Sequence, residues 1–330
     1  MRVLLMTMCS VAALTAPALA NTLLVGNKYE GTVSFIDLNS GQEAKRVETG
    51  GSPHEITLSP DGRTAVVVSY LEDGYIGEEL NVFDVETASH KATISTTPHQ
   101  APHGIAWIDN TRDVIVTTEE TRDVIRVNLD EQRVTGAAVT DQIGSHLLAL
   151  SPDSATSYVT SRGSDSVSVV DVSTMEVTST VAAGNGPEAV DVSPDGSTVW
   201  VGNNQSEDIY IYDAETMETK SRIEAGYLPI RVRFHPDGQQ VAVADLNGDR
   251  IVVYDAETHE KIKSIDLASA GVRTPASLLF APDGSSLFVG AQSSGNVAEI
   301  DTRSWELHRV LDAGDGADGL AYSNVGQAFS

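Results

Sequence analysis

Apolar and polar residues alternate in short runs, separated by turn signals, along almost the whole chain. The clearest unit occupies residues 187–226. Within it, residues 188–192, 198–202, 209–212 and 219–224 have the alternating or β-branched composition of strands. The sequence Ser193-Pro-Asp-Gly196 between the first two runs is typical of a tight turn. The unit therefore predicts four short antiparallel strands, which is the content of one propeller blade.

The same unit recurs along the chain. The aspartate that ends its third strand returns at intervals of 42 to 47 residues, with asparagine in one unit, at positions Asp37, Asp84, Asn128, Asp171, Asp213, Asp255 and Asp301. The SPDG-type turn accompanies it at Pro60, Pro152, Pro194, Pro236 and Pro282. Seven units without a shift in composition predict an all-β fold, a single seven-bladed β-propeller with four antiparallel strands per blade.

The ends of the repeat region predict how the ring closes. Residues 22–26 (TLLVG) match the second strand of a unit, and residues 318–322 (DGLAY) match a first strand. We expect the C-terminal strand to join the N-terminal blade, because this pairing leaves no exposed sheet edge. The propeller domain is then expected to span residues 21–330.

Residues 1–20 have the pattern of a signal peptide and not of a blade. Arg2 precedes the apolar residues 3–14, and Ala18-Leu19-Ala20 forms a small-x-small cleavage signal. We therefore expect a secreted or periplasmic protein. Cys9, the single cysteine of the chain, lies in this segment, so no disulfide is expected in the mature protein. No later apolar run is long enough to span a bilayer.

The charge narrows the range of partners. The formal net charge is −26 at pH 7, and such a surface repels the phosphate backbone of nucleic acids. The same acidity would keep a monomer soluble or attract a cationic partner, and charge alone does not separate these. The expected partners are a small-molecule ligand or a periplasmic protein, and a monomer is expected.

Two units resemble a known repeat. Residues 158–161 (YVTS) with 167–171 (VSVVD), and residues 199–203 (VWVGN) with 209–213 (IYIYD), are similar to the YVTN repeat of bacterial seven-bladed propellers. The resemblance extends over nearly all of residues 22–324. It implies the propeller fold and leaves the function open, because that family includes binding proteins, lactonase-like proteins and members of unknown role.

The repeat register also predicts where a site would lie. Four histidines (His54, His99, His103 and His146) fall at or just before the start of an innermost strand, and the other four belong to the opposite rim. Alignment of the first strands selects one ring position per unit at the channel mouth, occupied by His54, His103, His146, Glu188, Ile230, Ala276 and Asp318. Loops after the second strands open on the same face, because first and second strands are antiparallel. These loops contribute Tyr70, Glu119, Arg162 and Asn204, and Arg231 follows the ring position of its own unit.

Three hypotheses follow for this face. In the leading one, His54, His103, His146 and Glu188 bind one zinc, copper or iron ion beside a small ligand, with hydrolytic, lyase or redox chemistry at an open position. Arg162, Tyr70, Asn204 and Asp318 would contact that ligand, and Glu119 and Arg231 are the candidate catalytic residues. In a metal-free alternative, Arg231, Arg162 and Lys28 hold a carboxylate of an anionic ligand, while a histidine and Glu119 or Glu188 serve as acid and base. The PHE, PHG and PE strand starts resemble those of lactonase-type propellers, and this resemblance implies that His, Glu and Arg are used on this face. In the third hypothesis the propeller is no enzyme and docks a periplasmic dehydrogenase or transport component.

Overall fold

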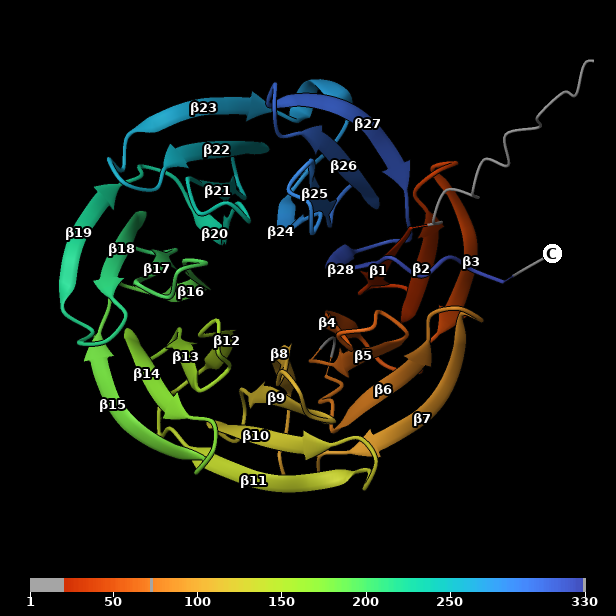
Figure 1. Ribbon diagram of the computed structural model, residues 1–330, viewed down its shortest axis with the longest axis horizontal. Coiled ribbons are helices and arrows are strands. Elements are labelled where there is room, and N and C mark those ends of the chain that lie inside the picture. Colours follow the sequence, from red (N-terminus) through yellow and green to blue (C-terminus); the bar gives the residue numbers. More distant parts are fainter. Residues whose placement is uncertain (1–20, 72–73, 329–330) are drawn as a thin grey trace, which may run out of the picture.

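The strands form seven radial sheets around a central channel. The computed structural model describes residues 21–71 and 74–328, so the signal peptide predicted at residues 1–20 lies outside the described part. Every sheet has four antiparallel strands (Figure 1). This architecture confirms the predicted seven-bladed, all-β propeller. The described residues add one short 3-10 helix, η1 (Ala268–Ala270).

In each blade the strands run from the channel outward. The innermost strands are β28 (Ala317–Ser323), β4 (Pro53–Leu58), β8 (Pro102–Trp107), β12 (Ser145–Leu150), β16 (Pro187–Val192), β20 (Pro229–Phe234) and β24 (Pro275–Phe280). The second strands are β1 (Thr22–Asn27), β5 (Thr64–Ser69), β9 (Asp113–Thr118), β13 (Thr156–Ser161), β17 (Thr198–Asn203), β21 (Gln240–Asp245) and β25 (Ser286–Ala291).

The outer half of each blade follows the same order. The third strands are β2 (Thr32–Asp37), β6 (Glu79–Asp84), β10 (Asp123–Asn128), β14 (Ser166–Asp171), β18 (Asp208–Asp213), β22 (Arg250–Asp255) and β26 (Asn296–Asp301). The outermost strands are β3 (Gln42–Glu48), β7 (Ser89–Ser95), β11 (Arg133–Val139), β15 (Glu176–Ala182), β19 (Thr219–Glu224), β23 (Lys261–Asp266) and β27 (Glu306–Asp312). Each third strand ends on the aspartate or asparagine that the repeat predicted.

Burial explains why these sequences take these places. The second strands read as continuous apolar runs because both of their faces pack against neighbouring strands, as in β17, where Trp200 is fully buried against Phe234 of the next blade. The outermost strands are exposed along most of their length and are correspondingly polar, as in β3. The apolar cores therefore lie between adjacent blades and hold the ring together through side-chain burial.

The C-terminal strand closes the ring as predicted. β28 pairs antiparallel with β1, with Leu23 opposite Tyr322, and Figure 1 shows this blue strand inside the red N-terminal blade. Gly319 lies in β28 where its backbone approaches β4, because a Cβ at this position would stand 1.8 Å from the carbonyl oxygen of His54. Among the described residues, no helix is long and apolar enough to cross a membrane.

Candidate functional site

A polar cavity lies at the mouth of the channel, where the innermost strands begin. Its volume is about 290 Å³, and all seven predicted ring residues line it. Among the predicted loop residues, Tyr70 and Arg162 also reach its wall, together with Arg231 of β20. Glu119 and Asn204 lie just behind them, bonded to residues of this wall.

The side chains converge here because the inner strands are irregular at their first residues. In β4 the pairing register with β5 shifts between Pro53 and Ile56, and comparable shifts occur at the start of every other inner strand. Such an irregularity breaks the strict alternation of a strand and redirects the side chains. Two successive residues, His54 and Glu55, therefore both reach the site.

The rings of the three ring-position histidines lie next to one another, with His103 in the middle. The ring centroid of His103 lies 4.1 Å from that of His54 and 3.7 Å from that of His146, and Tyr70 stands nearly perpendicular to it at 4.4 Å. His103 is 1 % exposed, and neither of its ring nitrogens has a hydrogen-bond partner. Burial, followed by the proximity of His146 and His54, lowers the pKa of His103 well below its usual value. This imidazole is therefore neutral at pH 7, with a free lone pair.

His54 has one ring nitrogen occupied and one available. Its Nε2 lies 3.3 Å from Oδ2 of Asp318, which also accepts a hydrogen bond from Gln292. A carboxylate beside Nε2 favours the tautomer with its proton there, which leaves the lone pair on Nδ1. That Nδ1 is buried without a hydrogen-bond partner, 3.7 Å from Glu55. One ligand atom each from His54, Glu55 and His103 lies within 4.8 Å of the others, a grouping that can hold a metal ion.

His146 is held differently from the other two histidines. Its Nδ1 lies 2.6 Å from Oε2 of Glu119, and its Nε2 lies 3.2 Å from Oε1 of Glu188. Each ring nitrogen of His146 therefore faces a carboxylate oxygen. In this arrangement His146 and Glu188 bind each other, and the group of ligand atoms that can hold a metal ion consists of His54, Glu55 and His103.

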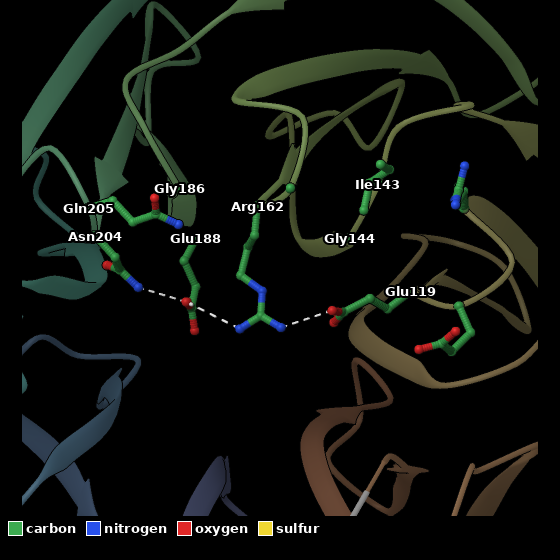
Figure 2. A pocket seen from close by; sticks show the side chains of 11 residues that line it. Glu119, Ile143, Gly144, Arg162, Gly186, Glu188, Asn204 and Gln205 are labelled. Atoms are coloured by element: carbon green, nitrogen blue, oxygen red, sulfur yellow. Dashed lines mark hydrogen bonds and ion pairs between the residues drawn. The ribbon is translucent and has the colours of Figure 1, made fainter.

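Glu119, Arg162 and Glu188 form a row of ion pairs beside His146. Figure 2 shows Arg162 between Glu119 and Glu188, with Nη2 bonded to Glu119 at 2.8 Å and Nη1 3.6 Å from Glu188. Asn204 Nδ2 donates to Glu188 at 2.6 Å (Figure 2). The hydroxyl of Tyr70 donates to Glu119 at 2.7 Å. Each of the two carboxylates is therefore fixed by at least three different side chains.

Arg231 supplies the buried positive charge of the cavity. It is 5 % exposed, its Nη2 lies 2.8 Å from Glu55 and 3.9 Å from Asp318, and its Nη1 lies 3.8 Å from Glu188. Burial opposes the charge, but these three carboxylates outweigh it and raise the pKa of Arg231 further. The guanidinium therefore stays charged while largely withdrawn from water.

The site carboxylates remain ionised. Burial alone would raise the pKa of Glu188, but the charge and hydrogen bond of His146 and the two arginines outweigh it and lower the pKa to about 2. The same balance, with His146 and Arg162 as the main opposing groups, holds the pKa of Glu119 well below its usual range. For Glu55, the charge of Arg231 is the main influence opposing burial, and the pKa is again lowered. Conversely, burial and then Glu119 raise the pKa of the Tyr70 hydroxyl, which stays neutral.

Two features differ from the sequence interpretation. Glu55, which the repeat register does not select, contacts both Arg231 and His54, and only the irregular start of β4 brings it there. His99, grouped with the site histidines by its position, instead bonds Asp123 at 2.7 Å and does not line the cavity.

The fold and the site together define a seven-bladed propeller with a buried cluster of histidines, carboxylates and arginines at the channel mouth. The sequence model of the family described as "Lactonase, 7-bladed beta-propeller" matches residues 23–229 and 220–313. The chain belongs to this family, which agrees with the propeller resemblance drawn from its repeats.

Solved structures show the same fold at low identity. Hydrazine synthase of Kuenenia stuttgartiensis superposes with a TM-score of 0.74 at 17% identity, covering 85% of this chain and 92% of that one. A functionally unknown protein from Desulfotomaculum acetoxidans gives a TM-score of 0.77 at 14% identity, covering 92% of this chain and 99% of that one. No curated protein matches the chain. At these identities the solved structures support the fold alone.

Proposed function

We propose that the protein binds one divalent transition-metal ion at the channel mouth through His54, His103 and Glu55, and acts there on a small ligand. The observation that carries the proposal is His103, a fully buried imidazole with neither ring nitrogen hydrogen-bonded. Leaving buried polar atoms unpaired is unfavourable by about 1–3 kcal/mol each, so a partner is expected. Imidazole and carboxylate donors fit zinc, copper or iron.

The neighbouring residues complete such a centre. Asp318 would orient His54 from outside the ligand set, as carboxylates do for metal-bound histidines. A metal ion held by three protein ligands keeps an open position, where it polarises a carbonyl group and activates water. Arg231 would stabilise negative charge on the ligand, because it is a buried guanidinium at the wall of the same cavity.

The low pKa values assign Glu119 and Glu188 a positioning role. A general base works best when its pKa is near the working pH, whereas these carboxylates stay ionised far below it. They hold His146 and Arg162 in place instead. Hydrolysis of an ester or lactone is the first reaction to test, because the family is named for lactonases.

A metal-free site is the second candidate, and one observation favours it. The 2.6 Å contact between His146 and Glu119 is the histidine–carboxylate geometry of many acid–base catalysts. In that case hydrolysis would persist in the presence of a chelator and fall in Glu119→Gln. Under the metal-dependent proposal, chelation abolishes turnover and added metal restores it.

The deciding experiment measures metal content and affinity in protein prepared without a histidine tag. We expect about one zinc, copper or iron ion per chain by elemental analysis. Zn²⁺ titrated calorimetrically into stripped protein should bind at least about 100-fold more weakly in His103→Ala and His54→Ala, because each loses a ligand. Affinity should also fall as the pH approaches about 6.5, because protons compete for imidazole. The matched control is His308→Ala, an exposed histidine of β27. Equal affinity in the wild type and His103→Ala would refute the proposed site.

A further inference from the structure

One side of the channel-mouth cavity is apolar. Ile230 of β20 and Ala276 of β24 line it from two adjacent blades, and Leu246, which directly follows β21, lines it as well. The ring position is polar or charged in the other five blades, and the remaining lining residues also carry polar or charged groups. Ile230, Leu246 and Ala276 therefore form a separate apolar wall of the cavity.

The loop positions show the same division. One residue directly follows each second strand, and the seven are Lys28, Tyr70, Glu119, Arg162, Asn204, Leu246 and Gln292. Leu246 is the aliphatic member of this set. Its backbone N–H donates to the carbonyl oxygen of Leu228 at 3.2 Å, and its side chain packs against the apolar core that joins the blades of β20 and β24. Leu246 is only partly buried, so it is held in place while part of its side chain faces the cavity.

The apolar wall lies across the channel from the histidines. The inner strands follow one another around the ring in the order β28, β4, β8, β12, β16, β20 and β24, so β20 and β24 each lie three blades away from β8 (Figure 1). His103 belongs to β8, and His54 and His146 belong to the neighbouring β4 and β12. The cavity therefore has a polar side and an apolar side that face each other.

The size of the cavity limits the ligand. Its volume of about 290 Å³ is at the lower end of ligand-binding pockets, which have about 300–1,000 Å³. A water molecule occupies about 30 Å³ in the liquid, so the cavity has room for about ten non-hydrogen atoms. A molecule of this size that contacts both sides has a polar group at one end and a short apolar group at the other.

We propose that the ligand is a small acyl compound, such as an ester or lactone, with a short alkyl chain that lies on Ile230, Leu246 and Ala276 while its carbonyl group faces the histidines. This inference rests on the proposed function, in which the metal centre acts on a carbonyl group, and it names the substrate class of that site. Each methylene group that the wall removes from water strengthens binding by about fourfold. Leu246 is then a specificity-determining residue, because it adds apolar surface where the other blades place polar side chains.

The first test measures chain-length dependence in the absence of metal. Propanamide, pentanamide and heptanamide share one carbonyl group and differ only in their alkyl chains. Each is titrated into metal-stripped full-length protein kept in chelator, and binding is followed by ligand-observed NMR. Affinity should rise by about fourfold for each added methylene group, or by about 15-fold from propanamide to pentanamide. A rise of less than about twofold per methylene group, or no binding of heptanamide at its solubility limit, would overturn the proposal.

Variants of Leu246 locate the alkyl chain. Leu246→Gln places a polar group of similar size on the wall and should reduce the rise to less than about twofold per methylene group, with propanamide binding unchanged. Leu246→Met keeps an apolar side chain and should retain the rise. The matched control is Ile262→Gln, which changes an exposed residue of β23 in the same blade and should also retain it. An unchanged rise in Leu246→Gln contradicts the assignment.

A measurement on the wild type does not depend on the folding of Leu246→Gln. In protein with labelled leucine methyl groups, heptanamide should shift the Leu246 signals, which are identified as those missing from the Leu246→Met spectrum. Absence of a shift at saturating heptanamide would refute contact with the wall. Because both experiments use chelator, a chain-length dependence without metal affinity refutes only the metal centre. Metal affinity without chain-length dependence refutes only this inference.

Discussion

The two rims of the ring satisfy their carboxylates in different ways. At the rim of the SPDG-type turns, each aspartate is bonded by its own turn: Ser193 donates to Asp195 at 2.6 Å, and Ser59 donates to Asp61 at the same distance. At the channel mouth the partners come from other blades, and the Arg231–Glu55 bond joins residues 176 positions apart. The first arrangement repeats from blade to blade, and the second occurs once.

This difference shows how to interpret a repeat sequence. A local problem, such as closing a tight turn, has the same solution in every unit, so the same residues recur and report the fold. A cluster assembled across blades needs a different residue from each unit. At the ring position three units carry histidine, one carries glutamate and one carries aspartate, whereas two carry Ile230 and Ala276. Departure from the repeat therefore marks the candidate site.

The largest expected effect on stability comes from removing the buried arginine, Arg231. In Arg231→Met the carboxylates of Glu55 and Asp318 lose their buried counter-charge, and we expect a loss of about 3–5 kcal/mol in the free energy of unfolding. Arg63→Met on the turn rim removes an exposed pair with Glu86 and should cost no more than about 1 kcal/mol. Urea unfolding followed by circular dichroism compares the two. Similar losses would show that the two rims are energetically equivalent.

The second-largest effect is expected at low pH, where the ion pairs at the channel mouth should contribute less to the free energy of unfolding. The pKa of Glu188 is lowered in the folded state from an ordinary 4.5 to about 2. A depressed pKa adds stability above about pH 4.5, and that stability is lost as the pH falls toward 2; for Glu188 it amounts to about 3 kcal/mol. The lowered pKa values of Glu55 and Glu119 act in the same direction.

The corresponding measurement is urea unfolding at pH 6, 4 and 3. The wild type should lose stability steeply over this range, and Glu188→Gln should start lower and decline less. If the free energy of unfolding declines equally in both proteins, Glu188 does not cause the acid sensitivity.

The smallest effect is expected at a single turn. Asp195→Asn weakens the hydrogen bonds that the carboxylate accepts from Ser193 and from the backbone of Ser197, which should cost about 0.5–1 kcal/mol. Because turns in different blades share no partners, Asp61→Asn should add an equal and independent loss. Melting curves of the two single variants and the double variant check this. A loss in the double variant that departs clearly from the sum would show that the turns are coupled through the ring.

The fold was predictable because its signals are local. The Asp-terminated third strands and the SPDG turns each report their own conformation, so seven blades and the closure by β28 follow from spacing alone. The ring positions follow from the same register, which is why the structure places His54, His103 and His146 together.

The remaining details of the site depend on geometry that the pattern does not contain. Strict alternation would turn Glu55 away from His54, and only the irregular pairing at the start of β4 brings both side chains inward. Similarly, sequence gives no reason to separate His146 from the other two histidines. Its partner Glu119 comes from a neighbouring blade, and their 2.6 Å contact exists only once the ring is assembled.

The closure by β28 also determines when the polar cluster at the channel mouth can be completed. β28 follows every other described strand in the chain, yet it forms the inner strand of the first blade and carries Asp318. Until it docks, His54 has no carboxylate at Nε2 and Arg231 lacks one of its counter-charges. A nascent chain with six blades already folded therefore has an unfinished channel mouth. Ring closure is therefore required to complete the polar cluster at this face.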